Sequence, residues 1–399
     1  MNMFLNKILI VLFFFYPVTL LTGTAGSNFV QIFSIIILLL CLFLKKENIF
    51  LKENNINYFT NNYSLFAFLF SIYIVLNLLV NKDYNNSFLY IRFWLYTLII
   101  IFLIDHKNTL KYFSIYFFFI FNFFVVDGFI QLITGYNLML NPAIDKYNLI
   151  NGFFNDKKLG SALSRLFPIY LYLISQNEVL SQKKKLVFIS CLATIVLLVF
   201  TRERVAILLG LITFVIFYLI NFNKRKLYAI FFGLFFFILT ISSNITIKNN
   251  LWKGTTNQIF QNNKIVFWSV VHQSYAETSF IIYKNNIIFG SGAKSYREEC
   301  KLINLSSCST HPHNFFFQIL AELGTVGIFF YLFFYIFLIK KLINSFTSNN
   351  KYSILLISVL LFNFNPLLPS GNFFNSWLNC LLYFPLAFLI GKNELLKKK

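Results

Sequence analysis

The chain has 399 residues, of which 58% are hydrophobic and only 12% are charged. This composition excludes a large soluble enzyme domain, because one soluble core cannot bury so much apolar surface. The formal net charge of +20 does not indicate nucleic-acid binding, since Lys and Arg stand in small groups between apolar runs. We therefore expect a polytopic membrane protein that contacts lipids and no nucleic acid.

Apolar runs of nearly membrane-spanning length recur along the whole chain. A transmembrane helix needs about 20 apolar residues, so the apolar fraction fits about twelve helices. Hydropathy places them, in chain order, at 8–21, 29–44, 63–80, 88–104, 112–133, 163–174 (the weakest), 186–200, 205–220, 227–241, 315–339, 354–368 and 374–390. The expected fold class is thus all-α, with about twelve transmembrane helices and one long polar loop.

The distribution of Lys and Arg predicts the orientation. The positive-inside rule places both termini in the cytoplasm and the long polar segment on the far side of the membrane. The expected units are nine transmembrane helices in 1–241, the outer loop in 242–313 and three transmembrane helices in 314–399. At the N-terminus an alternative stays open: Lys7, the apolar run 8–15 and the small residues 23–26 resemble a signal peptide cleaved after Ala25.

Two of the five cysteines, Cys300 and Cys308, lie in the long outer segment. In an oxidising compartment such as the bacterial periplasm we expect them to form a disulfide. The alternatives are two unrelated thiols, or a zinc site with His311 and His313, although no C-x-x-C spacing supports metal binding.

No soluble catalytic motif is present: the P-loop, the dinucleotide fingerprint, G-x-S-x-G and H-E-x-x-H are all absent from the sequence. ATP-driven or redox chemistry is therefore not expected, and no cofactor is predicted. Attention moves to polar residues that gather at the predicted outer face.

The densest polar cluster follows Cys308. Asn314, Gln318 and Glu322 are spaced i, i+4, i+8, so they form one stripe that descends about 12 Å along a helix. His311 and His313 precede the stripe. Polar groups in a membrane helix are costly unless they face protein or water, which predicts a functional site. For Gln318 and Glu322, hydrogen bonding between helices is the alternative.

Arginines form a second cluster. Arg202 and Arg204 fill a very short outer turn, against the positive-inside trend, and guanidinium groups bind phosphate oxygens bidentately. They predict a diphosphate site, with an ion pair from Arg204 to Glu203 or Asp127 as the alternative. Arg165 and Arg297 are further candidates for this site, whereas Arg92 is expected to be structural. Asp127 and Gln131 would orient the arginines.

These motifs together resemble the O-antigen ligase and O-antigen polymerase superfamily. The resemblance is carried by Gly290-Ser-Gly292-Ala-Lys-Ser-Tyr-Arg297, by Cys300 and Cys308, and by His311-Pro-His313-Asn314 through Glu322-Leu-Gly324. Upstream it includes Asp127-Gly-Phe-Ile-Gln131 with Gly135, Gly152-Phe-Phe-Asn-Asp156, Gly160-Ser-Ala-Leu-Ser-Arg165 with Pro168, and Glu203-Arg204-Val-Ala206. It covers the chain from about Arg92 to Gly327.

The resemblance implies a GT-C-like, metal-independent, inverting glycosyltransferase of the bacterial inner membrane with a periplasmic active site. The donor would be a glycan on undecaprenyl diphosphate. The acceptor would be lipid A core in a ligase, our first expectation, or a lipid-linked repeat unit in a polymerase. His313 matches the family's general base and Arg204 its diphosphate ligand. Many members carry another Arg before Gly-x-Gly; here Lys264, His272 or Arg297 would replace it.

Three other functions compete with this interpretation. A flippase or exporter of lipid-linked glycan also has about twelve spans, but its charges should line a central path. Transfer of a glycan to protein shares the same signature. A structural protein is the weakest alternative, because it has no need for His313 and several arginines at one face.

Overall fold

The computed structural model describes residues 2–43, 62–82, 85–104, 107–144, 149–220, 224–243, 245–249, 251, 256–257, 260–261, 264–265, 268–303, 308–347 and 350–397. The described part is all-α apart from one short antiparallel hairpin, β1 (Phe260–Gln261) with β2 (Lys264–Ile265). The helices are α1 (Asn2–Thr22), α2 (Thr24–Phe43), α4 (Asn62–Val80), η2 (Asn86–Tyr90), α5 (Ile91–Ile104), α6 (Lys107–Thr134), α7 (Leu159–Gln176), α8 (Glu178–Gln182), α9 (Lys184–Phe200), α10 (Arg204–Leu219), α11 (Lys224–Ser243), α12 (Ile245–Lys248), α14 (Val270–Asn285), α15 (Tyr296–Ile303), α16 (Phe315–Thr347), α17 (Ser353–Asn363) and α18 (Ser376–Lys397).

Each predicted span coincides with a helix, and the chain is a polytopic membrane protein. Seven helices are long and apolar enough to cross a membrane: α1, α2, α4, α5 with the end of η2 before it, α6, α11 and α16. The apolar helices α10, α17 and α18 are shorter. Within the described residues, length and composition thus support seven spans, fewer than the twelve that hydropathy predicts.

The last two predicted spans extend too far toward each other. α17 ends at Asn363 and α18 begins at Ser376, so 364–375 is a non-helical segment rather than a tight turn. Pro366 and Pro369 explain its length, because proline lacks the N–H that a helix needs. This segment, here called the 364–375 loop, contributes directly to the site described below.

The span predicted as weakest, α7, is the most deeply enclosed helix. Nearly all of its side chains are buried, and it packs against α10, α17 and α6. Its low hydropathy reflects Ser161, Ser164 and Arg165 near its beginning. Ser161 and Arg165 line the polar cavity described below.

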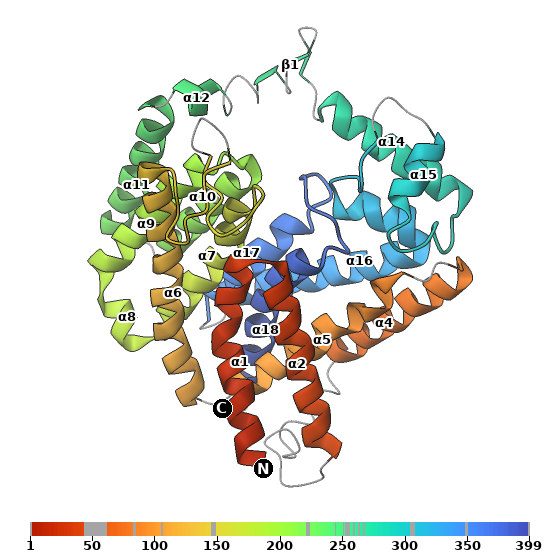
Figure 1. Ribbon diagram of the computed structural model, residues 1–399, viewed down its shortest axis with the longest axis horizontal. Helices are drawn as coiled ribbons and strands as arrows, with labels where there is room; N and C mark the ends of the chain where they lie inside the picture. Colours follow the sequence, from red (N-terminus) through yellow and green to blue (C-terminus); the bar gives the residue numbers. More distant parts are fainter. Residues whose placement is uncertain are drawn as a thin grey trace.

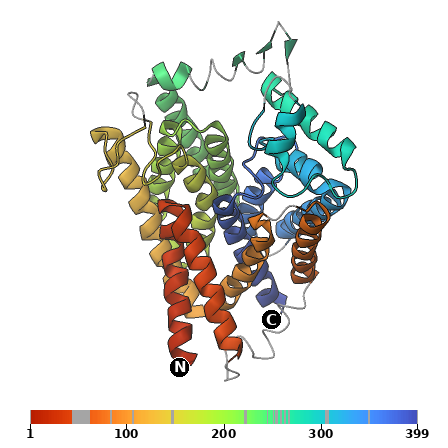
Figure 2. The same cartoon turned by 45° about the vertical axis from the view of Figure 1, so that its right-hand side comes forward.

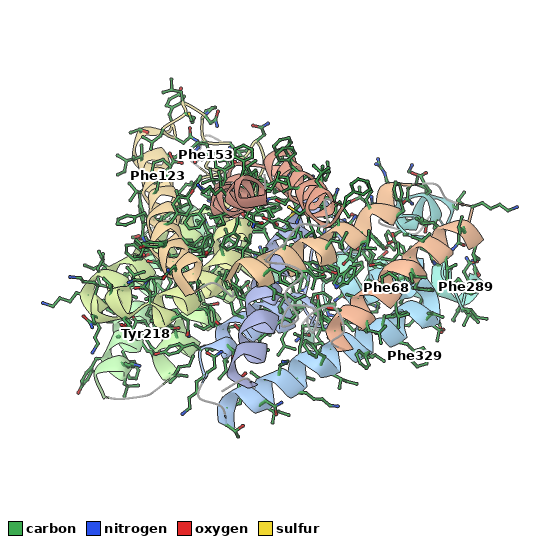
Figure 3. All side chains as sticks on the ribbon, turned by 90° about the horizontal axis from the view of Figure 1, so that it is seen from below. Phe68, Phe123, Phe153, Tyr218, Phe289 and Phe329 are labelled. Atoms are coloured by element: carbon green, nitrogen blue, oxygen red, sulfur yellow. A yellow bond between two sulfur atoms is a disulfide. The ribbon has the colours of Figure 1, made fainter. Side chains whose placement is uncertain are left out.

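The helices are arranged with a clear polarity (Figures 1 and 2). α1 begins and α18 ends toward one end of the bundle, whereas β1, α14 and α15 lie toward the opposite end. Large aromatic side chains are exposed on several helices, among them Phe68, Phe123 and Phe329, which are labelled in Figure 3. Exposed apolar rings around a helical bundle are typical of a lipid-facing surface.

Candidate active site

Residues 308–314, here called the histidine segment, lead directly into α16. Asn314 precedes the first residue of this helix, and its side-chain oxygen accepts a hydrogen bond from the Phe317 backbone N–H at 3.2 Å. Asn314 thereby satisfies one of the N–H groups that every helix start leaves open. Its Nδ2 donates to the carbonyls of Pro366 (2.8 Å) and Leu368 (3.0 Å). One side chain therefore fixes the start of α16 against the 364–375 loop.

Further hydrogen bonds fasten the same loop beside His313. The Ser370 backbone N–H donates to the His313 carbonyl at 2.8 Å, and Ser370 Oγ accepts from the Phe315 N–H at 2.8 Å. One turn deeper, Gln318 Oε1 accepts from the Phe373 N–H at 2.7 Å, while Gln318 Nε2 donates to Asn372 Oδ1 at 3.0 Å. Asn314 and Gln318 of the predicted polar stripe thus both hold the 364–375 loop against the beginning of α16.

Glu322 ends the stripe with a different contact. It is fully buried, and its Oε1 accepts from the Tyr296 backbone N–H at the first residue of α15, at 3.1 Å. Its Oε2 accepts from Gln318 Nε2 at 3.0 Å. Glu322 therefore holds α15 against α16, which agrees with the interhelical alternative for this residue.

α16 is interrupted at Gly324, where φ is 62° and ψ is −158°. The break leaves carbonyl groups without helical partners, and the Gly-x-Gly segment supplies donors: Ser291 N–H binds Ala321 O and Gly292 N–H binds Glu322 O, both at 3.0 Å. Irregular backbone at membrane depth is tolerated where such partners exist. The motif Gly290-Ser-Gly292 is thus a structural clamp on the broken helix.

A cavity of about 890 Å³ opens beside the histidines. Its walls come from the beginning of α7 and the residues before it, the beginnings of α10, α14 and α18, the histidine segment and the 364–375 loop. The basic and imidazole side chains that line it are Lys157, Lys158, Arg165, Arg204, His272, His311 and His313. Among the described residues that line this cavity, none is acidic. Such a lining favours an anionic ligand.

Arg165 is firmly held in the cavity wall. Its Nε and one terminal nitrogen donate to Asn363 Oδ1 at 3.0 and 2.7 Å, and the other terminal nitrogen donates to Ser161 Oγ at 2.7 Å. The residue is only 3% exposed. This fixed geometry suits a binding site, because little side-chain entropy remains to be lost when a ligand arrives.

Glu203, which precedes α10, approaches the beginning of α7. Burial raises the pKa of its carboxyl group to about 7, against the opposing effects of hydrogen bonds from Ser161 and Gly160 and of the Arg165 charge. A Cβ on Gly160 would lie 2.9 Å from Glu203 Oε1, so only glycine leaves room for this approach. The carboxyl group therefore lies at the beginning of α7, where it accepts hydrogen bonds from Ser161 and Gly160 and is close to the Arg165 charge.

The three histidines form one aromatic group on the cavity wall. The ring centroids of His311 and His313 are 4.1 Å apart, those of His272 and His313 6.2 Å, and Tyr275 stacks on His313 at 5.5 Å. Burial, then the His313 charge, lowers the pKa of His311 to about 4. Burial, then the His272 charge, lowers the pKa of His313, and burial lowers that of His272. All three rings are therefore neutral at neutral pH.

Hydrogen bonds orient two of these rings. His313 Nε2 lies 3.2 Å from Ser309 Oγ, and His311 Nδ1 lies 2.9 Å from Thr310 Oγ1. His311 Nε2 is buried without a hydrogen-bond partner. His313 also has a positive φ of 52°, a backbone conformation that non-glycine residues adopt rarely and often at functional sites.

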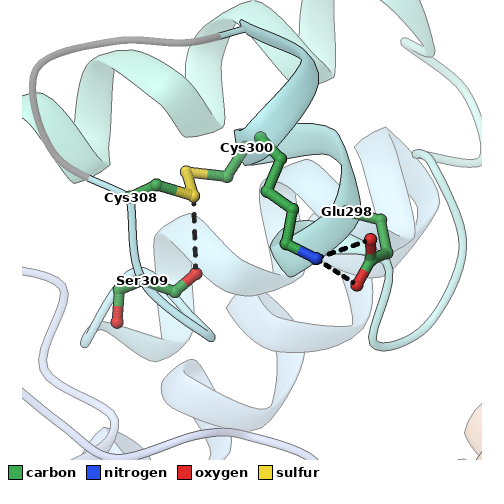
Figure 4. Close-up of polar contacts among 5 residues, drawn as sticks. Glu298, Cys300, Cys308 and Ser309 are labelled. Carbon is green, nitrogen blue, oxygen red and sulfur yellow. Dashed lines mark hydrogen bonds and ion pairs between the residues drawn. A yellow bond between two sulfur atoms is a disulfide. The ribbon is translucent and has the colours of Figure 1, made fainter.

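The disulfide between Cys300 and Cys308 connects α15 to the histidine segment, with a Cα–Cα distance of 5.8 Å (Figure 4). Ser309, the partner of His313, follows Cys308 directly. Because both sulfurs are joined to each other, the alternative zinc site with these cysteines is wrong. Over the described residues, no group of three or more His, Cys, Asp or Glu side chains is arranged to hold a metal ion.

The structure brings together some of the predicted site residues and separates others. His311, His313, Arg165 and Arg204 all line the cavity. Arg297 is exposed on α15 and, like Arg202, is not among the residues that line it. Lys264 and His272 were two expected replacements for the family's second arginine. The Lys264 side chain lies outside the described residues, whereas His272 lines the cavity.

Asp127 was expected to orient arginines, but the structure shows it binding the backbone of the segment after α6. Its Oδ1 accepts from the Leu138 backbone N–H at 2.8 Å, and Gln131 binds Asn151 and the Gly152 N–H. Both residues therefore fasten the segment after α6, because that segment folds back over the end of the helix. Neither lines the cavity.

Sequence reasoning missed several wall residues. Lys157 and Lys158 contribute to the sequence analysis only through the overall distribution of Lys and Arg, and Tyr275, Ser370 and Asn372 belong to no recognisable motif. The Pro-rich stretch between α17 and α18 was the available signal, since two prolines and a glycine within six residues indicate a structured loop.

Residues 189–332 match the O-antigen ligase family, whose members are membrane enzymes that transfer glycans. The matched range contains Arg204, His272, His311 and His313, and it ends within α16. The similarity to this family extends over residues 189–332. No curated protein matches the chain at a significant level.

Proposed function

We propose that this protein is an O-antigen ligase of the bacterial inner membrane. It transfers a glycan from undecaprenyl diphosphate to lipid A core at the periplasmic face. The observation that carries the proposal is the neutral His313 on the wall of a cavity that Arg165 and Arg204 also line. A base and a diphosphate-binding site are the two elements that such a transfer requires.

The proposed reaction is a single displacement. An acceptor hydroxyl oxygen attacks the anomeric carbon, its proton passes to His313, and the bond between that carbon and the diphosphate oxygen breaks. A base must be unprotonated to accept the proton, which the lowered pKa of His313 provides. When Ser309 accepts a hydrogen bond from Nε2–H, Nδ1 is the free base. Inversion at the anomeric carbon follows from a single displacement.

The leaving group is the polyprenyl diphosphate, whose negative charge grows as the bond breaks. Arg204 and Arg165 stabilise this charge with guanidinium groups, a role that metal ions fill in other phosphoryl-leaving reactions. Lys157 and Lys158 add positive charge at the same cavity. The four cations come from the beginning of α7, the residues before it, and the beginning of α10, so donor binding depends on how these elements pack.

The test combines gene deletion with one point variant. Cells lacking the gene should lose all glycan on lipid A core and accumulate long lipid-linked chains. Complementation with wild type should restore the pattern, and His313→Ala, at equal membrane abundance, should not. Wild-type transfer by His313→Ala would disprove the base assignment.

A polymerase is the second candidate, because the family match does not separate the two activities. In that case the deletion should leave lipid A core carrying a single repeat unit. An unchanged lipopolysaccharide pattern would exclude both and favour transfer to protein or export of the lipid-linked glycan.

A further inference from the structure

The segment that follows α6, residues 135–144 and here called the 135–144 loop, exposes an apolar tip. Its exposed large apolar side chains are those of Tyr136, Leu138, Met139, Leu140 and Ile144. From position 128 to position 144 the sequence contains no Asp, Glu, Lys or Arg. A contiguous exposed apolar patch of this kind marks an interaction surface, so the loop needs a partner.

The loop continues an apolar face of α6. The exposed large apolar residues of this helix are Tyr112, Phe119, Phe123, Val126 and Ile133. Their spacing of seven, four, three and seven positions places them on one side of the helix. The stripe is about 30 Å long, which matches the hydrocarbon thickness of a bilayer.

α6 is one of the helices that are long and apolar enough to cross the membrane. If its exposed stripe faces lipid, Ile133 lies where the hydrocarbon ends and the 135–144 loop lies at the level of the lipid headgroups. In Figure 2 the end of α6 and the loop that follows it (yellow-brown) lie at the outer edge of the bundle. The loop is therefore placed beside lipid rather than over the centre of the protein.

The tip of the loop satisfies its own backbone donors, mainly through Asn137. The Asn137 N–H donates to the Asn141 carbonyl at 3.1 Å, and the Leu140 N–H donates to the Asn137 carbonyl at 2.9 Å. Asn137 Oδ1 accepts from the N–H groups of Met139 (3.0 Å) and Asn141 (2.8 Å). Asn137 itself is only 2% exposed. The polar centre of the loop is thus inside, and the apolar side chains are outside.

Two further hydrogen bonds attach the tip to the protein. The Leu138 N–H donates to Asp127 Oδ1 at 2.8 Å, so each backbone N–H from 137 to 141 has a partner within the described residues. Asn137 Nδ2 donates to the Gly152 carbonyl at 2.9 Å, and Lys157, five positions later, lines the cationic cavity. Because unpaired backbone groups are costly in an apolar medium, this pairing suits a loop that enters lipid.

We propose that the 135–144 loop inserts its tip, Leu138 to Leu140, into the bilayer leaflet on the side of the cationic cavity. The partner is the boundary between the phospholipid headgroups and the acyl chains, where apolar side chains of interfacial segments are buried about 5–10 Å deep. The inserted loop anchors the segment that carries Lys157 and so fixes the depth of the cavity relative to the headgroups. This inference does not depend on glycosyl transfer.

Quenching of fluorescence by lipid tests the insertion. Met139→Trp and wild type are placed in nanodiscs that hold one protein each, made from phosphatidylcholine with or without bromine on its acyl chains. The emission of the added tryptophan, taken as the difference from wild type, should fall by roughly half in the brominated discs, because its ring would lie within the headgroup and acyl boundary. Met139 is 70% exposed, so the larger ring meets no packed neighbours there.

Leu302→Trp is the matched control. Leu302 is as exposed as the tip, at 79%, but it lies on α15 beside the exposed ion pair of Lys301 with Glu298, where water is expected. Its added emission should be the same in both kinds of disc. If Met139→Trp does not fold, Leu138→Trp places a ring on the same tip and should be quenched in the same way.

Unchanged emission at the tip would overturn the insertion, because a tip covered by another protein or exposed to water is not reached by brominated lipid. Equal quenching at positions 139 and 302 would overturn it as well, since the effect would then not be specific to the loop. A second copy of the chain cannot produce the expected result, because each disc holds one protein.

Discussion

Gly290 and Gly324 lie so close together that neither position has room for a side chain. A Cβ on Gly324 would lie 2.5 Å from Gly290 N, and a Cβ on Gly290 would lie 2.6 Å from Gly324 N. Both residues also have positive φ, 71° and 62°. The clamp between the Gly-x-Gly segment and the broken α16 therefore depends on two glycines that are 34 positions apart in the sequence.

Gly324→Ala should destabilise the protein by roughly 2–4 kcal/mol, because backbone strain and a steric clash add at this position. Gly135→Ala separates the two effects. Gly135 also has a positive φ, 81°, but a Cβ there meets nothing within 4 Å, so this variant should lose only about 1–2 kcal/mol. Thermal unfolding in detergent compares the variants, and equal losses would contradict the clash.

Arg204→Lys should reduce kcat/KM for the lipid-linked donor roughly tenfold to a hundredfold. A lysine keeps the charge but loses the planar fork that binds two phosphate oxygens. Arg297→Lys is the matched control, since Arg297 is exposed and does not line the cavity. A loss with Arg297→Lys as large as with Arg204→Lys would place the diphosphate elsewhere.

The pH dependence of transfer should have its acid limb below pH 6.5. His313 has a lowered pKa, so it is unprotonated at neutral pH and loses its function as base only when the pH falls through that lowered value. A profile of kcat/KM against pH measures this limb. A limb near pH 7 that disappears in Glu203→Gln would report Glu203 instead, whose pKa is about 7.

The same histidines limit the usable pH range. Because their pKa values are lower in the folded protein, the unfolded chain binds protons first as the pH falls below about 6.5, and the folded state loses stability. The profile should therefore be restricted to pH values at which the melting temperature is unchanged.

Reduction of the Cys300–Cys308 disulfide should lower transfer, because Cys308 directly precedes the serine that orients His313. Closing a loop with a sequence separation of 8 also stabilises the fold by roughly 2–3 kcal/mol. Activity and melting temperature with and without reductant measure both effects. The double variant Cys300→Ser/Cys308→Ser is the control and should not respond to reductant; a response would locate the sensitivity elsewhere.

Local sequence patterns predicted the apolar helices and several residues of the site. They could not predict contacts between segments that are far apart in the sequence. Hydropathy located the apolar helices but not α14, whose 16 residues lie in the segment predicted as a loop. The i, i+4, i+8 spacing placed Asn314, Gln318 and Glu322 on one face. The partners of that face, in the 364–375 loop, are about 50 residues away and carry no periodic signal. Arg297 looked equivalent to Arg204 in the sequence, because only packing decides which arginine faces the cavity.

The 364–375 loop means that the cavity wall is completed late in the synthesis of the chain. The histidines and arginines are synthesised well before this loop, yet the cavity wall requires Ser370 and Asn372 to join His313 and Gln318. A chain that stops after α16 would contain every predicted catalytic side chain and still lack a complete pocket. Under the proposed function, donor and acceptor therefore meet only after α17 and α18 have folded, so partly made chains would not consume lipid-linked glycan.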